Sequence, residues 1–180
     1  MTISHPPPAF DLPAALLSQG YRLRPETDAD IPFLLALYAS TREEELRAVP
    51  WPDEMKAAFC AQQFQAQRGH YHATIAHCRF DVIEHHGEPV GRLYLQDRPT
   101  RLHIVDIALM PAMRGQGIGT AVLEALHALG RQTGRGVGIM VEIHNPARNL
   151  YRRLGYREVE KHGLHLEMEW LPSNDQLNSA

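Results

Sequence analysis

The stretch Arg114-Gly115-Gln116-Gly117-Ile118-Gly119-Thr120 decides how this chain of 180 residues is interpreted. An apolar segment that ends at Leu109 precedes it, and apolar residues at helical spacing follow it as far as Gly134. Glycines between a strand and a helix leave the first amides of the helix unblocked, and the helix dipole adds positive charge there. The stretch therefore indicates an anion site suited to a phosphate-bearing ligand; the alternative is a tight turn that only packs the helix onto a sheet.

Two common phosphate-binding motifs do not fit this stretch. A dinucleotide-binding turn has its third glycine three residues after the second, and an acidic residue about 20 residues later. Here Gly117 and Gly119 are separated by one residue, and 135–140 contains no acid. A nucleotide P-loop requires Gly-Lys-Ser/Thr, but the two lysines of the chain, Lys56 and Lys161, are far from the turn.

The segment Arg101–Leu109, before the turn, has the pattern of a central strand. Its apolar side chains occupy both alternating faces: Leu102, Ile104 and Ala108 on one, Val105, Ile107 and Leu109 on the other. A strand that is apolar on both faces is covered by other elements on both sides.

Outward from this strand, helical and strand-like patterns mix without internal repeats. Helices are predicted from Ile31, from Pro52 to near Gly69, from Ile118 to Gly134 and over Pro146–Leu154. Further strands are predicted at Tyr21–Arg24, His72–His77, Phe80–Glu84, Pro89–Gln96, Val137–Ile143, Tyr156–Lys161 and Leu164–Trp170. The mixture favours a single α/β sandwich with helices on both faces of the sheet.

Proline content and polarity suggest how the chain is divided. Four prolines lie within the first 20 residues, and the chain is polar after Pro172. We expect residues 1–20 to form a mobile N-terminal arm, 21–171 the folded domain and 172–180 a polar C-terminal tail.

Composition excludes several classes of protein. The hydrophobic fraction of 44% and the charged fraction of 22% are ordinary for a globular domain. No uncharged apolar run approaches the roughly 18 residues that a membrane span needs. Two cysteines, Cys60 and Cys78, are too few for a disulfide framework. With a formal net charge of −3, we expect a soluble, cytoplasmic protein without a membrane or nucleic-acid partner.

Charge is divided unevenly along the chain. The segment Glu26–Glu54 holds eight acidic residues and two arginines, a net charge of −6, whereas Pro111–Arg157 has a net charge of +5. One segment suits a cation and the other an anion, unless both are only solvated surfaces.

Two motifs then point to a known family. The pattern Arg114-x-x-Gly117-x-Gly119 after a strand resembles the pyrophosphate-binding motif of the GNAT superfamily of acyl-CoA-dependent N-acyltransferases. Downstream, Asn145-Pro146-Ala147 and Leu150-Tyr151-Arg152-Arg153-Leu154-Gly155-Tyr156 resemble its second motif, Asn-x-x-Ala followed by Leu-Tyr-x-x-x-Gly-Phe/Tyr, with one residue fewer between Asn and Ala. The wider pattern around Pro50-Trp51 and His70-Tyr71 resembles an uncharacterised bacterial branch.

The resemblance implies both a fold and an activity. The fold is a single domain with a mixed β-sheet of six to seven strands, flanked by helices on both faces. The activity is an N-acetyltransferase that moves an acetyl group from acetyl-CoA to an amine of a small molecule or peptide, by direct attack in a ternary complex. A CoA-binding sensor without turnover, and a transferase that uses a longer acyl-CoA or an O-acceptor, remain alternatives.

The resemblance also implies where acetyl-CoA binds. In the family it lies in a V-shaped opening between two neighbouring parallel strands, here those ending near Leu109 and Ile143. The implied donor-binding residues are Ile107, Ala108, Leu109, Arg114, Gly115, Gln116, Gly117, Ile118, Gly119, Thr120 and Asn145.

For catalysis, Tyr151 resembles the family's general acid, which would protonate the departing thiolate. The general base is left open between Asp106, Glu142, His144 and no single residue. Asp106 is notable because an isolated carboxylate in an apolar strand is costly unless it is used or paired.

The acceptor is expected to enter past the acidic region 41–51. Acidic and aromatic side chains there suit a cationic amine. The expected substrate-binding residues are Tyr38, Glu43, Glu44 and Trp51. Although the chain has eleven histidines, none has the spacing of a supported metal site, so we expect no metal. A homodimer, common in the family, is left open.

Overall fold

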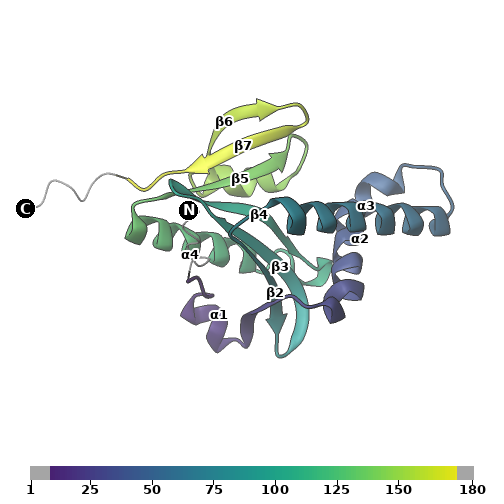
Figure 1. Cartoon of the computed structure of the whole chain (residues 1–180), viewed down its shortest axis with the longest axis horizontal. Helices are drawn as coiled ribbons and strands as arrows, with labels where there is room; N and C mark the ends of the chain where they lie inside the picture. The colour runs from purple at the N-terminus through teal and green to yellow at the C-terminus, as the bar shows by residue number, and fades with distance from the viewer. Residues whose placement is uncertain (1–8, 174–180) are drawn as a thin grey trace, which may run out of the picture.

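The computed structural model of the chain describes residues 9–173 and contains one seven-stranded sheet in the order β1-β2-β3-β4-β5-β7-β6 (Figure 1). Six to seven strands were expected in a mixed sheet, and this is confirmed. The strands are β1 (Tyr21–Pro25), β2 (Cys78–His85), β3 (Glu88–Asp97), β4 (Arg101–Leu109), β5 (Gly136–Glu142), β6 (Arg157–His162) and β7 (His165–Trp170).

The sheet contains one parallel pair, β4 with β5, and all its other neighbouring strands are antiparallel. The parallel pairing covers only the first half of β4, from Arg101 opposite Gly136 to Ile104 opposite Ile139. Within the described chain the two strands have no pairing beyond that point. They therefore separate at their carboxyl ends, as the family resemblance implied.

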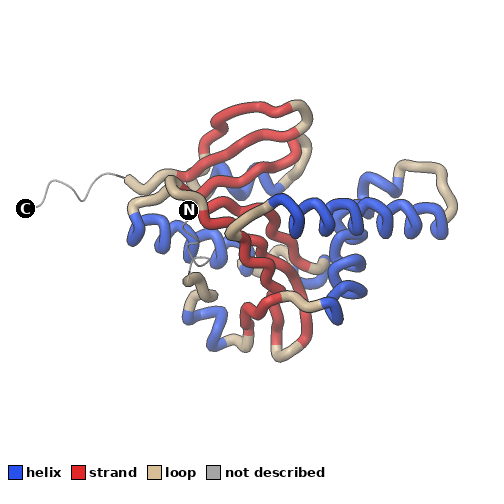
Figure 2. Tube along the Cα trace, viewed as in Figure 1, coloured by secondary structure: helices blue, strands red, loops and turns tan. Residues whose placement is uncertain are grey.

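Helices cover both faces of the sheet (Figure 2). One face carries α1 (Ala14–Ser18), α4 (Ile118–Thr133) and the inner side of α5 (Ala147–Arg153); the other carries α2 (Ile31–Arg47) and α3 (Asp53–Thr74). Consecutive residues of β2 show this division, because Ile83 belongs to the main core and Val82 to a smaller core under α2 and α3.

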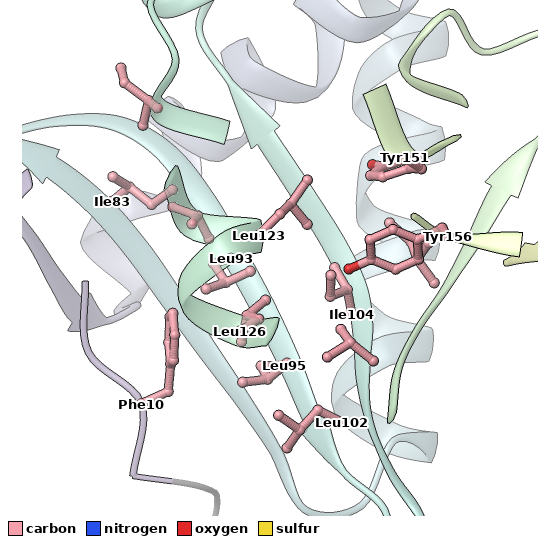
Figure 3. Packing of buried hydrophobic residues seen from close by; sticks show 14 of the residues in the cluster. Phe10, Ile83, Leu93, Leu95, Leu102, Ile104, Leu123, Leu126, Tyr151 and Tyr156 are labelled. Atoms are coloured by element: carbon pink, nitrogen blue, oxygen red, sulfur yellow. The ribbon is translucent and has the colours of Figure 1, made fainter. Parts of the chain in front are cut away.

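The main core lies between α4 and the centre of the sheet (Figure 3). Leu123 and Leu126 of α4 pack with Leu93 and Leu95 of β3, and all four side chains are almost fully buried. Tyr151 belongs to the same cluster, although it also borders the opening between β4 and β5. The core thereby anchors α5 beside this opening.

A β-bulge at Val105 corrects the predicted faces of the central strand. Tyr94 of β3 pairs with Asp106, but the next residue, Leu95, pairs with Ile104, so Val105 is skipped. The extra residue reverses the alternation of side chains beyond it. Ile107 consequently packs against the same core as Ile104, and Asp106 lies on the other face, towards α3.

The predictions of a helix end near Gly69 and of a strand at His72–His77 were wrong, because α3 continues to Thr74 and β2 begins only at Cys78. The final turn of the helix has physical support: Arg68 and His72 both reach the buried carboxylate of Glu26, at 3.3 and 2.8 Å. Aromatic contact between His72 and Phe80 adds to this anchoring. Tertiary contacts thus override the strand-like local pattern.

Residues 9–20 pack against the domain rather than forming an arm. Phe10, Leu12 and Leu16 are buried in the main core, with 8%, 3% and 5% of their surface exposed. The Phe10 carbonyl also accepts a hydrogen bond from Arg79 of β2 at 2.7 Å. The boundary expected at residue 20 therefore moves towards the N-terminus. Residues 1–8 and most of the expected tail, 174–180, lie outside the described part of the chain.

At the opposite edge of the sheet, β6 is exposed along its whole length. Its pairing with β7 is interrupted by a second bulge, where Glu158 pairs with Met168 and Glu160 with Glu167, so that Val159 is skipped. Its remaining residues are mostly charged.

We predict that Leu16→Ala lowers the free energy of unfolding by about 2–3 kcal/mol, because it removes buried methyl groups from the main core. Leu171→Ala is the control, since 63% of Leu171 is exposed; its effect should stay below about 0.5 kcal/mol. Urea denaturation of both variants measures this. Equal, small effects would mean that residues 9–20 add no stability.

Candidate active site

The glycine turn has the backbone geometry of an anion site. Gly115 and Gly117 have φ angles of +72° and +82°, a region that favours glycine, and Gly117 forms the N-terminal cap of α4. A Cβ built on Gly119 meets no atom within 4 Å. The first turn of α4 is therefore open to a ligand, whose negative charge would face unpaired amides and the positive end of the helix dipole.

A large cavity, of about 1040 Å³, extends from this turn to the carboxyl ends of β4 and β5. Of the residues predicted to bind the donor, all but Gln116 line it: Ile107, Ala108, Leu109, Arg114, Gly115, Gly117, Ile118, Gly119, Thr120 and Asn145. The Gln116 side chain instead donates to the Ala112 carbonyl at 2.6 Å, so only its backbone faces the turn. Residues separated by almost 40 positions thus meet around one opening.

A second cavity, of about 590 Å³, lies on the other face of the sheet, under α3. Its wall includes Gln67 and Tyr71 of α3, Arg92 of β3, and His103 and Asp106 of β4. Ala108, Glu142, Asn145 and Tyr151 border both cavities, together with Thr41, Arg42, Ile107 and His165. The two cavities therefore meet where β4 and β5 part.

Tyr151 lies at this meeting point, with only 5% of its surface exposed. Burial, and secondarily the nearby Asp106 carboxylate, raise the pKa of its phenol above the usual value of 10. The hydroxyl consequently remains protonated at neutral pH and serves as a hydrogen-bond donor.

Asp106 is paired rather than isolated. Its carboxylate accepts a hydrogen bond from Arg92 at 2.6 Å, and the Arg92 side chain is 4% exposed. Arg92 also donates to Gln67 at 3.0 Å and lies 5.0 Å from the centre of the Tyr94 ring. Removing either partner of such a buried ion pair strongly lowers the free energy of unfolding, because the other charge is left buried without a partner.

The other predicted acidic residues are more exposed. Glu142 pairs with Arg42 of α2 at 3.2 Å, across the rim that both cavities share. Glu44 lines the larger cavity, whereas Glu43 pairs with Arg47 at 3.7 Å and lines neither.

The two aromatic residues expected at the acceptor site differ in position. Tyr38 is buried and lines the smaller cavity. Trp51 packs edge-on against Phe59, with ring centres 5.6 Å apart, and lines neither cavity.

Helix α2 also contacts the glycine turn directly. Arg114 donates from Nη2 to Ser40 at 3.0 Å and from Nε to the Leu109 carbonyl at 2.8 Å. One guanidinium therefore connects the turn, the end of β4 and α2.

Sequence reasoning missed the arginines of the smaller cavity. Neither Arg92 nor Arg98 was assigned a function from the sequence. Arg92 is a single charge within the apolar part of β3, and such a charge indicates a buried ion pair or a functional group. The unexplained Asp106 on the neighbouring strand carries the opposite charge, so the two could have been predicted to pair.

A cluster of Glu160, His162 and Glu167 on the β6–β7 hairpin has ligand atoms within 4.8 Å of one another. Arg101 already binds Glu167 at 2.5 Å, and two of the three residues are exposed. In the described part of the chain, no helix is both long and apolar enough to cross a membrane.

Comparison with known families decides the classification. The model of the Acetyltransferase (GNAT) family matches residues 34–156, which include the glycine turn and both diverging strands. The chain belongs to this family. The membership of the GNAT superfamily expected from the sequence is thus confirmed.

Similar proteins support the GNAT fold. An N-alpha-acetyltransferase of Sulfurisphaera tokodaii is 33% identical over 96 residues, which cover 45% of this chain and 58% of that relative. Since that relative is archaeal, the bacterial branch remains a prediction.

Two solved structures share the fold at low identity. The PaiA N-acetyltransferase of Thermoplasma acidophilum, in complex with coenzyme A, matches 84% of this chain and 99% of its own with a TM-score of 0.63 and 12% identity. An acetyltransferase of Thermus thermophilus matches 84% and 97% with a TM-score of 0.60 and 21% identity.

Two buried histidines make stability depend on pH. Burial, and secondarily neighbouring arginines, lower the pKa of both His103 and His127 to about 4. In the unfolded chain their pKa is about 6.5, so the unfolded state binds more protons as the pH falls from about 6.5 towards 4. Each histidine therefore removes up to about 3 kcal/mol of stability over that window.

We predict that His127→Gln flattens this pH dependence. The glutamine side chain stays neutral in both the folded and the unfolded state. The free energy of unfolding of the variant should therefore fall less than that of the wild type between about pH 7 and pH 4.5. Urea titrations at a series of pH values measure the slope. An unchanged slope would mean that His127 is protonated equally in both states.

Proposed function

We propose that this GNAT protein transfers an acetyl group from acetyl-CoA to an amine within a ternary complex. The observation that carries the proposal is the meeting of two cavities at the diverging ends of β4 and β5, one of which begins at the glycine turn. Each substrate can then approach the reaction centre from its own face of the sheet.

The donor is proposed to occupy the larger cavity. Its pyrophosphate would accept hydrogen bonds from the amides of residues 115–120, and Arg114 would add positive charge. The backbone of Ile107, Ala108 and Leu109 would bond the pantetheine, because these residues lie where β4 has lost its parallel neighbour and its polar groups need partners. Asn145 borders the same opening.

The reaction joins the acceptor nitrogen to the thioester carbonyl carbon and breaks the carbon–sulfur bond. An amine with a pKa near 10.4 is almost entirely protonated at pH 7, which costs roughly 4.6 kcal/mol for the neutral form. The site must therefore deprotonate the amine or lower its pKa. A backbone amide near Leu109 would stabilise the tetrahedral oxyanion.

Tyr151 is proposed to assist the departing thiolate. Because its phenol has a raised pKa, full proton transfer to a thiolate with a pKa near 8.5 is uphill by at least about 2 kcal/mol. The hydroxyl therefore acts mainly by donating a hydrogen bond to sulfur. The proton that the attacking nitrogen must still lose as it becomes an amide passes to the departing thiolate, which leaves as the thiol of CoA.

Of the two carboxylates, Asp106 suits the amine better than Glu142. The Asp106 side chain is 17% exposed and borders the acceptor-side cavity, whereas Glu142 is 48% exposed and pairs with Arg42 at the rim. Asp106 would orient the ammonium and receive its proton directly or through water. His144 lines only the donor-side cavity.

The proposed acceptor side is the smaller cavity, with Tyr38 in its wall and Glu44 near the shared rim. The acceptor is an amine of a small molecule or of a peptide. The activity named for the Sulfurisphaera relative makes a peptide N-terminus one candidate.

Acetyl-CoA is predicted to stabilise the protein against unfolding. At 100 times its dissociation constant a ligand adds about 2.7 kcal/mol of stability, which thermal denaturation detects. Gly119→Val should abolish most of this shift, because its side chain would occupy the open space at the start of α4. Gly69→Val is the matched control, since Gly69 lies in α3 and also faces open space. A protein that shows no shift with acetyl-CoA would refute the donor site.

Tyr151→Phe is predicted to lower the rate of acetyl transfer roughly a hundredfold, because it removes the donor to the thiolate. Its acetyl-CoA dissociation constant should change little. Tyr156→Phe is the matched control: Tyr156 is also buried, its hydroxyl has no hydrogen-bond partner, and it lines neither cavity. Free-thiol release over a panel of amines gives the rate and calorimetry gives the affinity. Equal losses of both in Tyr151→Phe would exclude the proposed role.

A further inference from the structure

The smaller cavity contains more positive charge than its carboxylates neutralise. Three arginines line it, Arg42, Arg92 and Arg98, against Glu142 and Asp106. The first two arginines pair with these two carboxylates, at 3.2 and 2.6 Å. Among the residues that the structure describes, Arg98 has no carboxylate partner within ion-pair distance.

The neighbours of Arg98 leave its guanidinium available. Its Nε donates to Gln96 at 2.8 Å, and Gln96 is neutral and lines the same cavity. The adjacent Asp97 is bound by Arg135, and Glu167 is bound by Arg101. Burial, and secondarily Arg101, lower the pKa of Arg98 from its usual value, and Glu167 only partly opposes this.

His103 lies at the same end of the cavity. It is 7% exposed, and its Nδ1 is buried without a hydrogen-bond partner. Burial, Arg98 and Arg101 lower its pKa and keep its ring neutral at physiological pH. A neutral imidazole can still donate one hydrogen bond, so His103 and Arg98 together offer donors and positive charge to an anion.

The two ends of the cavity therefore differ in charge. Asp106 and Glu142 lie towards the opening between β4 and β5, while Arg98 and His103 lie towards the beginning of β4. His103 pairs with Gln96 and Asp106 pairs with Tyr94, so the bulge at Val105 leaves the two residues two positions apart along the strand, about 7 Å. A ligand that spans the cavity meets acceptors for an ammonium at one end and donors for an anion at the other.

We propose that the acceptor is an amine that also carries a carboxylate, held by Arg98 and His103 while its nitrogen faces the opening between the strands. This inference rests on the proposed function and specifies its substrate class. Arg98 bonds to Arg101 at the beginning of β4 and so lies farther from Asp106 than His103 does. An ω-amino carboxylate, with several bonds between its two groups, therefore fits better than glycine. An acidic side chain next to a peptide N-terminus offers the same chemistry.

The test compares amines that differ only in the carboxylate. We expect kcat/KM for ε-aminocaproate to exceed that for hexylamine by roughly tenfold to a hundredfold, the range of one charge-assisted hydrogen-bonded pair. Cadaverine, with a second ammonium in place of the carboxylate, should be the poorest of the three. Equal rates, or a preference for cadaverine, would overturn the proposal.

Variants then assign the preference to the named residue. Arg98→Gln should reduce the ratio of kcat/KM for ε-aminocaproate to kcat/KM for hexylamine at least tenfold, and Arg98→Lys should restore part of this ratio. Arg157→Gln is the matched control for loss of one positive charge, because Arg157 is exposed on β6 and is not among the described residues that line either cavity. An unchanged ratio in Arg98→Gln would exclude Arg98 as the anion-binding group.

A pair of peptides distinguishes the two sources of carboxylate. An Ala-Glu dipeptide amide is compared with Ala-Gln amide and with ε-aminocaproate. A preference for the glutamate peptide assigns an acidic N-terminus, and a preference for ε-aminocaproate assigns a free amino carboxylate. Either result supports the anion site. Equal kcat/KM for the Glu and Gln peptides, together with equal kcat/KM for amines with and without a carboxylate, contradicts it.

A binding measurement separates this inference from the proposed function. Calorimetry of ε-aminocaproate with the CoA-bound protein and with its Arg98→Gln variant needs no turnover. Binding that depends on Arg98 but is never followed by acetyl transfer would refute the transferase and keep the anion site. Turnover of amines without any carboxylate preference would keep the transferase and refute the site.

Discussion

The parting of β4 and β5 after Ile104 and Ile139 is the constraint on which the rest of this structure depends. A sheet with a gap in its centre leaves polar backbone groups without strand partners, which is costly unless something else bonds them. The cost is contained because both strands remain paired on their outer sides, β4 with β3 and β5 with β7. Only the inner edges face the opening, where a ligand with alternating amide groups can supply the missing bonds.

Two further features complete the opening. The bulge at Val105 turns Asp106 towards α3 while it keeps Ile107 on the core side. On the other face, the core holds Tyr151 against α4 and so sets a phenol beside the gap. Asp106 and Tyr151 are thus positioned by strand pairing and core packing outside the proposed reaction centre.

Local sequence patterns predicted most helices and strands. Features that depend on contacts between distant residues could not be predicted from these patterns. The glycine turn and the helix that follows it were predicted because glycine φ preferences and apolar periodicity are local properties. The mixed sheet of six to seven strands followed from the resemblance to the GNAT superfamily. The bulge at Val105 is not visible in the sequence, because it depends on how two strands pair. The final turn of α3 depends on Glu26, and the packing of Phe10 on a sheet formed much later in the chain. Most residues that line the larger cavity around the glycine turn were predictable from a contiguous motif, but Arg98 and His103 become neighbours in the smaller cavity only in the folded chain.

The exposed strand β6 has a consequence for how the protein behaves at high concentration. An open strand edge is a template on which another chain can extend the sheet, and aggregation often begins there. Here the edge alternates charges of both signs, from Arg157 and Glu158 to Glu160 and Lys161, and the bulge at Val159 breaks its regular hydrogen-bond spacing. A second copy of β6 that paired with it in parallel register would place like charges opposite one another. The sheet thus has a gap between its central strands β4 and β5, and an edge strand, β6, whose charges and bulge oppose growth into fibrils.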